Sequence, residues 1–247
     1  MTRIVNNCVA LVCLCLFWGQ SLRAADASHS EQIKWGNESV FNEEHNTLGL
    51  FSGVLGGQIV LAGGTSDDYS RWGRNAVCLS ENAGFALYED VLSKPLAYGA
   101  SITLSDGILC IGGRDSSQCY EDVFFVTMQQ GKLNVSEDWP PLPFPLSNAA
   151  GALLDNKVYL FGGRKSVSPS RLSDSFFVLD LSNKSRGWKE LPGYPGCVRE
   201  DAILVVQNNG VSPCLYLLGG QTETEEGLSS CLTDGYVYTP NWVNGVH

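Results

Sequence analysis

The chain has 247 residues, of which 44% are hydrophobic and 17% are charged, a composition typical of a globular protein with a sizeable core. Glycine is frequent, with 27 residues, which favours a turn-rich β protein over a helical one. The formal net charge is -10, and an acidic surface argues against nucleic acid or an anionic membrane as the main partner.

The first 27 residues have the pattern of an export signal peptide. Arg3 supplies the positive start, residues 8–19 form an apolar run, and Ala25 and Ala27 flank a small-residue cleavage site. The run is shorter than the roughly 20 residues that a membrane helix needs, and an uncleaved anchor is the alternative. We therefore expect an exported protein, periplasmic or secreted, that is free of the membrane after cleavage. Export permits disulfides, but their pairing cannot be read from the sequence.

One apolar motif that ends in two glycines occurs four times. It reads IVLAGG at 59–64, ILCIGG at 108–113, VYLFGG at 158–163 and LYLLGG at 215–220, and the second glycines lie 49, 50 and 57 residues apart. Two landmarks recur in phase after the glycines: an aspartate before apolar residues (Asp122, Asp174, Asp234) and a tryptophan (Trp139, Trp188, Trp242). Each repeat therefore predicts four short strands joined by turns.

A four-stranded sheet of this kind has two apolar faces, and radial packing of several sheets buries both. The glycine pairs let neighbouring backbones approach closely, and the outer tryptophan covers the face between two sheets. Period, glycine pair and tryptophan together resemble kelch repeats. We predict an all-β, kelch-type β-propeller over residues 28–247, with blade units near 46–95, 96–145, 146–196 and 197–247. The first repeat departs from the pattern, with Tyr88 in the place of the tryptophan, and a β-sandwich is the rival fold.

A stray landmark precedes the first repeat. Trp35 resembles the outer strand around Trp188, but no blade comes before it. In many propellers an N-terminal strand completes the last blade, yet the last repeat already has Trp242. We therefore expect about four blades of an expected six, with Trp35 closing a blade that this chain lacks. A four-bladed ring is the alternative.

With these landmarks the chain resembles the N-acetylneuraminate epimerase (sialic acid mutarotase) family, in a cyclically permuted order, over roughly residues 33–242. The segments that carry the resemblance are FSG at 51–53, LAGG at 61–64, LAYGAS at 96–101, CIGG at 110–113, YPGCVR at 194–199, LYLLGG at 215–220 and TEEGL at 224–228. The resemblance implies an exported propeller that interconverts the anomers of N-acetylneuraminate, a small acidic sugar, without a cofactor. The glutamate that serves the family as proton acceptor has no counterpart here.

The implied reaction needs a base for the anomeric hydroxyl, an acid for the ring oxygen, and an arginine for the substrate carboxylate. Propeller sites lie at one mouth of the channel, on loops that enter and leave the inner strands. This selects Arg199 and Glu200, at one inner-strand start, as catalytic candidates. The substrate-binding candidates are Tyr98 and Asn148 at equivalent starts, Arg114 and Arg164 after glycine pairs, and Arg74 on the first loop. Structural roles stay open for each of them: an ion pair between blades for Arg199, a solvated charge for Glu200, and a scaffold role for Arg114 and Arg164.

Two further functions compete with this isomerase. A non-catalytic kelch module that binds glycan or protein partners fits the same repeats, because a fold does not fix a function. A copper oxidase on the same fold is excluded, because the histidines after the signal peptide (His29, His45 and His247) all lie outside the repeats. The cysteine spacing matches no zinc pattern, so we expect no metal site.

Overall fold

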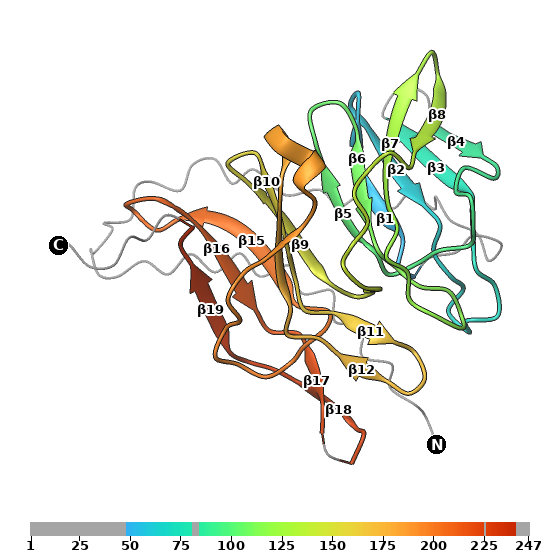
Figure 1. Ribbon diagram of the computed structural model, residues 1–247. Helices are drawn as coiled ribbons and strands as arrows, with labels where there is room; N and C mark the ends of the chain where they lie inside the picture. Colours follow the sequence, from blue (N-terminus) through green and yellow to red (C-terminus); the bar gives the residue numbers. More distant parts are fainter. Residues whose placement is uncertain (1–47, 81–83, 225, 241–247) are drawn as a thin grey trace, which may run out of the picture. The chain divides into compact units, whose positions relative to one another are not determined.

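The computed structural model describes residues 48–80, 84–224 and 226–240 (Figure 1). Division of the chain by its contacts gives two units, residues 1–38 and 39–247, and all described residues belong to the second. The predicted signal peptide, Trp35, Trp242 and the three histidines lie outside the described residues. None of the helices in the described part is long and apolar enough to cross a membrane.

The described chain folds into four antiparallel sheets, each a simple meander or nearly so. The first contains β1 (Phe51–Leu55), β2 (Gln58–Ala62), β3 (Ala76–Ser80) and β4 (Gly84–Tyr88). The second contains β5 (Ala100–Thr103), β6 (Ile108–Ile111), β7 (Val123–Gln129) and β8 (Lys132–Ser136). The third contains β9 (Ala150–Leu154), β10 (Lys157–Phe161), β13 (Phe176–Asp180) and β14 (Lys189–Glu190), and the fourth contains β15 (Ile203–Asn208), β16 (Pro213–Leu218) and β19 (Gly235–Tyr238).

Three smaller elements complete the described fold. The hairpin β11 (Arg164–Ser166) and β12 (Arg171–Leu172) follows β10, and the hairpin β17 (Gln221–Glu223) and β18 (Ser229–Cys231) follows β16. A short 3-10 helix, η1 (Leu181–Arg186), follows β13 and is capped by Asp180, whose side chain accepts from the backbone N–H of Ser182. The two hairpins lie close together in Figure 1, below the third and fourth sheets.

The first strands of successive sheets are neighbours: β1 contacts β5, β5 contacts β9, and β9 contacts β15. Each sheet therefore repeats the position of the one before it around a common centre, as the blades of a propeller do. The prediction of an all-β, kelch-type propeller with four blades in the chain is confirmed. The limits given above for each blade unit, and the signal peptide, stay predictions.

Apolar side chains fill the spaces between consecutive sheets. Phe51 of β1 meets Phe124 of β7 edge to face, with ring centroids 5.3 Å apart. The second and third sheets share a core that includes Leu109 and Leu160, both 0% exposed, and Trp139 and Trp188 pack against it. A third cluster joins β9, β10 and β13 to the inner residues of β15 and β16. Both faces of the second and third sheets are thus buried, as radial packing requires.

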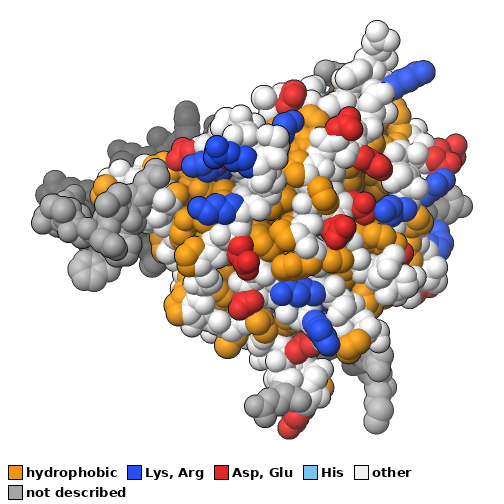
Figure 2. Space-filling view, in the orientation of Figure 1, with side chains coloured by type: hydrophobic (Ala, Val, Ile, Leu, Met, Phe, Trp, Pro, Cys, Tyr) orange, Lys and Arg blue, Asp and Glu red, His pale blue; other side chains and the backbone are white. Residues whose placement is uncertain are grey.

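The two end sheets each keep one apolar face that none of the sheets in the described chain covers. Val54, Ile59 and Phe85 on the first sheet are 41–50% exposed, and Ile203 and Val237 on the fourth are 51% and 56% exposed. Elsewhere, acidic and basic side chains are interspersed over the face shown in Figure 2 rather than gathered in one patch.

The glycine pairs join each sheet to the next. The N–H of Gly113 donates to the carbonyl of Leu146 at 2.8 Å, and the N–H of Gly64 donates to Leu96 at 2.9 Å. The preceding Gly112 has φ +62°, and a Cβ there would lie 2.2 Å from the carbonyl oxygen of Leu146. Only glycine fits this left-handed backbone and this close approach, which explains why the pair recurs.

Candidate functional site

The glycine pairs mark one edge of the sheets, which we call the glycine edge: the pairs themselves, the residue after each pair, and the two or three residues that precede each inner strand. Isolated bridges pair Leu48 with Thr65, Ala97 with Arg114, Ser147 with Arg164, and Glu200 with Gln221. The residue after each glycine pair therefore lies beside the chain that leads into the inner strand of its own sheet. The predicted site residues Arg114, Arg164 and Glu200 are all brought to this edge.

A row of backbone hydrogen bonds links the inner-strand starts. Gly49, Tyr98, Asn148 and Asp201 all have a positive φ, between 52° and 65°. The N–H of Tyr98 donates to Gly49 at 2.7 Å, that of Asn148 to Tyr98 at 2.6 Å, and that of Asp201 to Asn148 at 3.0 Å. We call Tyr98, Asn148 and Asp201 the corner row. Non-glycine residues with this backbone are uncommon and are enriched at functional sites.

The corner row corrects the predicted repeat alignment by one residue. Asp201, and not Glu200, occupies the position of Tyr98 and Asn148, while Glu200 corresponds to Ala97 and Ser147. The sequence alone does not show which residue aligns with Tyr98 and Asn148, because Glu200 and Asp201 are adjacent acidic residues. A left-handed backbone is the signal that separates them, and it becomes visible only in the fold.

Arg114 lies against two aromatic rings that also contact each other. The centre of its guanidinium is 4.6 Å from the ring of Tyr98 and 5.1 Å from that of Trp72, within the range of cation–π attraction. Its Nη1 donates to the carbonyl of Asp115 at 3.4 Å, while its buried Nε has no hydrogen-bond partner among the described residues. Arg114 makes no ion pair within the described chain, so its charge is available to an anion.

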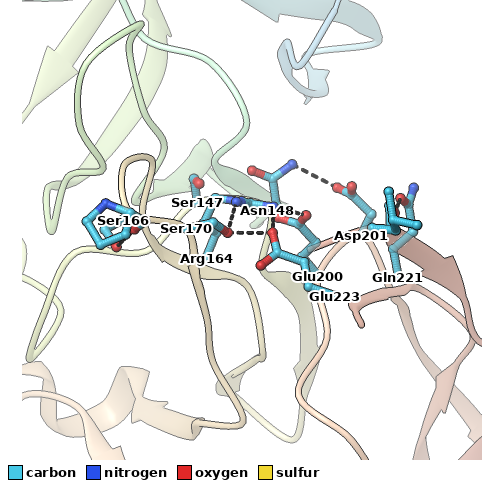
Figure 3. Close-up of polar contacts among 12 residues, drawn as sticks. Ser147, Asn148, Arg164, Ser166, Ser170, Glu200, Asp201, Gln221 and Glu223 are labelled. Atoms are coloured by element: carbon cyan, nitrogen blue, oxygen red, sulfur yellow. Dashed lines mark hydrogen bonds and ion pairs between the residues drawn. The ribbon is translucent and has the colours of Figure 1, made fainter. Parts of the chain in front are cut away.

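Asn148 and Asp201 face each other across the third and fourth sheets (Figure 3). The Nδ2 of Asn148 donates to Oδ1 of Asp201 at 2.9 Å, and the buried Oδ1 of Asn148 has no partner among the described residues. Burial of the Asp201 carboxyl among neighbouring protein atoms raises its pKa, opposed by the hydrogen bond from Asn148 and by the charges of Arg164 and Arg114. A carboxyl of this kind is a candidate for proton transfer.

Arg164 is held by two carboxylates, one shortly before β15 and one in β17. Its Nε and Nη2 donate to the two oxygens of Glu200 at 2.9 and 2.5 Å, and Nη2 also reaches Oε1 of Glu223 at 3.1 Å. Ser170, in the β11–β12 loop, bonds to both Arg164 and Glu223 (Figure 3). These contacts raise the pKa of Arg164, the Glu200 hydrogen bond most of all. The network joins the two hairpins, β11–β12 and β17–β18, and satisfies Arg164 within the protein.

Two predicted site residues lie elsewhere. Arg199 is 0% exposed, and its guanidinium donates to both carboxylate oxygens of Asp234, to the carbonyl of Gly219 and to the hydroxyl of Tyr194. This corrects its selection as a catalytic residue, because the side chain is fully buried and paired with Asp234 and so is out of reach of a substrate. Arg74 forms an ion pair with Asp90, just beyond β4, the outermost strand of the first sheet. It lies just before β3 and makes no ion pair or hydrogen bond with the corner row within the described chain.

Sequence reasoning missed Trp72, Glu223 and the role of Asp201. Trp72 lies on the same loop as Arg74, but its contact with Arg114 depends on a neighbouring sheet. Among the described residues, no group of three or more histidine, cysteine or acidic side chains is arranged to hold a metal ion. The six cysteines from Cys78 onward are unpaired.

Comparison with known proteins shows similarity to one family over part of the chain. Residues 139–244 match the family model for N-acetylneuraminate epimerase (NANM). The N-acetylneuraminate epimerase of Haemophilus influenzae (strain PittEE) is 30% identical over 106 residues, which are 43% of this chain and 25% of that protein. That of Vibrio cholerae is 30% identical over 119 residues, 48% of this chain and 28% of that protein. The matched part spans about a quarter of the length of these curated relatives, and the predicted kinship is confirmed over it.

A solved propeller agrees with the fold. The structure titled "Structure of YjhT" superposes with a TM-score of 0.61 at 13% identity, covering 78% of this chain and 66% of that chain. At this identity the likeness concerns the fold alone. The family match includes Asn148, Arg164, Glu200 and Asp201, whereas Tyr98 and Arg114 lie before it in the sequence.

Proposed function

The chain belongs to the N-acetylneuraminate epimerase family over residues 139–244, and from this we propose that it interconverts the anomers of N-acetylneuraminate at its glycine edge. The observation that carries the proposal is the arrangement of Arg114. It is a cation without an ion pair in the described chain, packed against the rings of Trp72 and of Tyr98, a member of the corner row. N-acetylneuraminate is an acidic sugar, and Arg114 supplies the charge that its carboxylate requires.

Charge makes this arginine necessary. The protein carries a formal net charge of -10 and would repel an anionic sugar over most of its surface. A guanidinium binds a carboxylate through parallel N–H donors, which fixes orientation as well as charge. Arg164 is the other arginine of the edge, but Glu200 and Glu223 already occupy it. The anion therefore binds at Arg114, and the Arg164 network supports the hairpins around it.

Two members of the corner row, Tyr98 and Asn148, supply neutral polar contacts. The unpartnered Oδ1 of Asn148 accepts a hydrogen bond from a sugar hydroxyl or from the N–H of the acetamido group. The Tyr98 hydroxyl lies 3.4 Å from that of Tyr69, and burial of Tyr98 raises its pKa, so it stays a neutral donor at neutral pH. A buried polar atom without a partner is costly, so a ligand that satisfies Asn148 gains affinity and selectivity.

The test follows the anomers directly. Purified protein is added to freshly released α-N-acetylneuraminate, and the anomer ratio is recorded by NMR over time. We expect faster equilibration than in buffer, and a loss of roughly tenfold or more in sugar affinity for Arg114→Gln, because one charged hydrogen-bonding group is removed. Arg186→Gln, an exposed arginine in η1, is the matched control. Equilibration no faster than in buffer rejects the proposal.

A second candidate function is a non-catalytic kelch module that binds acidic glycans. The observation in its favour is that both predicted catalytic residues, Arg199 and Glu200, are engaged in ion pairs within the protein. This second function is indicated if the sugar binds in a way that depends on Arg114 while its anomers equilibrate no faster than in buffer.

Export is part of the proposal. It rests on the sequence pattern of residues 1–27, and the product would act in a periplasmic or extracellular space. The mass of the protein recovered from that space is expected to match a chain cleaved after Ala27. A full-length mass would contradict cleavage.

A further inference from the structure

The corner row fixes Asp201 more firmly than an ordinary loop residue. Its N–H donates to the carbonyl of Asn148, its side chain accepts from the side chain of Asn148, and its own left-handed φ of 52° starts the fourth inner strand. A strained backbone of this kind persists only where surrounding contacts hold it. The carboxyl of Asp201 is therefore preorganised: it precedes the fourth sheet and is held by Asn148, which precedes the third.

The carboxyl of Asp201 also has a free oxygen. Oδ1 accepts from Asn148 at 2.9 Å, whereas Oδ2 has no hydrogen bond among the described residues. Protein atoms surround the carboxyl closely enough to raise its pKa, yet the residue keeps solvent-accessible surface at the edge. Its two acidic neighbours differ. Glu200 accepts from Arg164 through both oxygens, and Glu223 accepts from Arg164 and Ser170. Glu223 also keeps one oxygen, Oε2, without a hydrogen bond among the described residues, but its Oε1 forms an ion pair with Arg164. Of these three carboxyls, Asp201 is the one that makes no ion pair in the described chain.

We propose that Asp201 is the catalytic residue that carries the proton in the ring opening of the acidic sugar, and that Asn148 is its positioning residue. This inference rests on the proposed function. Arg114 binds the sugar carboxylate, which is attached to the anomeric carbon, and so brings the anomeric hydroxyl to the corner row.

The step balances with one carboxyl. Oδ2 of the Asp201 carboxylate takes the proton of the anomeric hydroxyl, the O–H pair becomes the second bond of a C=O group, and the bond from the anomeric carbon to the ring oxygen breaks. The pair of that bond goes to the ring oxygen, which receives the proton from Oδ2. Both oxygens are attached to the same carbon, so one carboxyl oxygen reaches each in turn. Closure on the other face of the ketone reverses the transfers and gives the other anomer.

The surroundings suit a group that must both take and release a proton. Glu200 raises the pKa of Asp201, in addition to burial, while Asn148, Arg164 and Arg114 lower it. The net direction is upward from the ordinary value of 3.8, which makes the carboxylate a stronger base than an exposed aspartate. The catalysed rate is therefore expected to fall with decreasing pH, with a midpoint above 3.8.

The experiment compares wild type with Asp201→Asn and a matched control, Asp106→Asn, an exposed aspartate in the β5–β6 turn. Anomer equilibration is followed by NMR, and binding is measured with the methyl glycoside of N-acetylneuraminate, which cannot open. We expect Asp201→Asn to lose on the order of 10²–10⁴-fold in catalysed rate, with glycoside affinity within a few fold of wild type. Asp106→Asn is expected to match wild type.

Several outcomes separate this inference from the proposed function. Equilibration by wild type at the rate of buffer overturns both. Catalysis that survives in Asp201→Asn overturns the role of Asp201 alone. If Asp201→Asn fails to fold, the role of Asp201 is tested instead with Asp201→Glu and with the pH dependence of the catalysed rate of wild type. Retained catalysis with a shifted midpoint in Asp201→Glu supports the role, and a wild-type rate that does not decrease toward acid overturns it.

Discussion

Arg199 and Asp234 form a bidentate pair in which the arginine is fully buried, with N–O distances of 2.7 and 2.9 Å. The carbonyl of Arg199 accepts from Gly163, as those of Leu96 and Leu146 accept from Gly64 and Gly113. Arg199 thus stands where the two preceding blades have a buried leucine. An arginine at a leucine position needs its own acceptors, and Asp234, Gly219 and Tyr194 provide them.

Replacement of Arg199 by leucine is expected to lower stability and leave catalysis nearly unchanged. The free energy of unfolding should drop by roughly 1–3 kcal/mol, because the Gly219 carbonyl and Tyr194 hydroxyl lose their partner. Urea unfolding measures the stability, and the NMR assay measures the rate per folded molecule. Asp234→Leu in the same background should cost less than it does in wild type, since the pair is already broken. A rate loss of a hundredfold at unchanged stability would return Arg199 to the active site.

Glu200 is expected to be dispensable for the proposed interconversion of the anomers. Glu200→Gln keeps an acceptor for Arg164 but removes the charge, so the network with Glu223 weakens while the corner row remains. We expect a catalysed rate within a few fold of wild type, measured by the same anomer assay. A loss comparable to that of Asp201→Asn would assign the proton to Glu200 instead.

The loop that carries Arg114 should loosen in acid. Burial acts to raise the pKa of Asp115, but hydrogen bonds from Tyr120, Ser117 and Gln118 outweigh it and lower that pKa from 3.8 to about 2. A lowered pKa means that folding favours the carboxylate. The stability from Asp115 is therefore complete above pH 3.8 and is lost as the pH falls toward about 2.

Asp115→Ala tests this contribution. Its unfolding free energy should lie below that of wild type at pH 6, and the gap should narrow as the pH approaches 2. Asp106→Ala, an exposed aspartate in the β5–β6 turn, is the control. A gap that stays constant with pH would mean that Asp115 acts without its charge.

Gly131 and Gly112 separate two costs of adding a Cβ: the strain of a left-handed backbone and the collision with a neighbouring carbonyl. Gly131→Ala, in the β7–β8 turn, places a Cβ in open space at φ +74° and should cost about 1–2 kcal/mol for the left-handed backbone alone. Gly112→Ala adds a collision with the Leu146 carbonyl at 2.2 Å and should cost roughly 1–3 kcal/mol more. Urea unfolding of both variants measures the difference. Equal costs would show that the sheets can separate at this junction without penalty.

Much of the fold could be predicted because its signals are local and repeated. The four glycine pairs give the ends of β2, β6, β10 and β16, and their spacing gives the number of sheets. The candidate site was predicted only in part. Arg114, Arg164, Tyr98 and Asn148 reach the glycine edge as the repeat positions indicate, whereas Arg199 and Arg74 do not serve it.

The sequence by itself determined the repeat, the strand order within each sheet and the kinship that the family match supports, because these depend on residue types at fixed spacing. The tertiary structure decided which charged side chains form ion pairs within the protein and which have no such partner and can bind a ligand. Arg114, Arg164 and Arg199 are the same residue type, yet one packs against aromatic rings, one joins two hairpins and one is buried. Their partners Tyr98, Glu200 and Asp234 come from other parts of the chain, and only packing of the sheets brings those groups within reach.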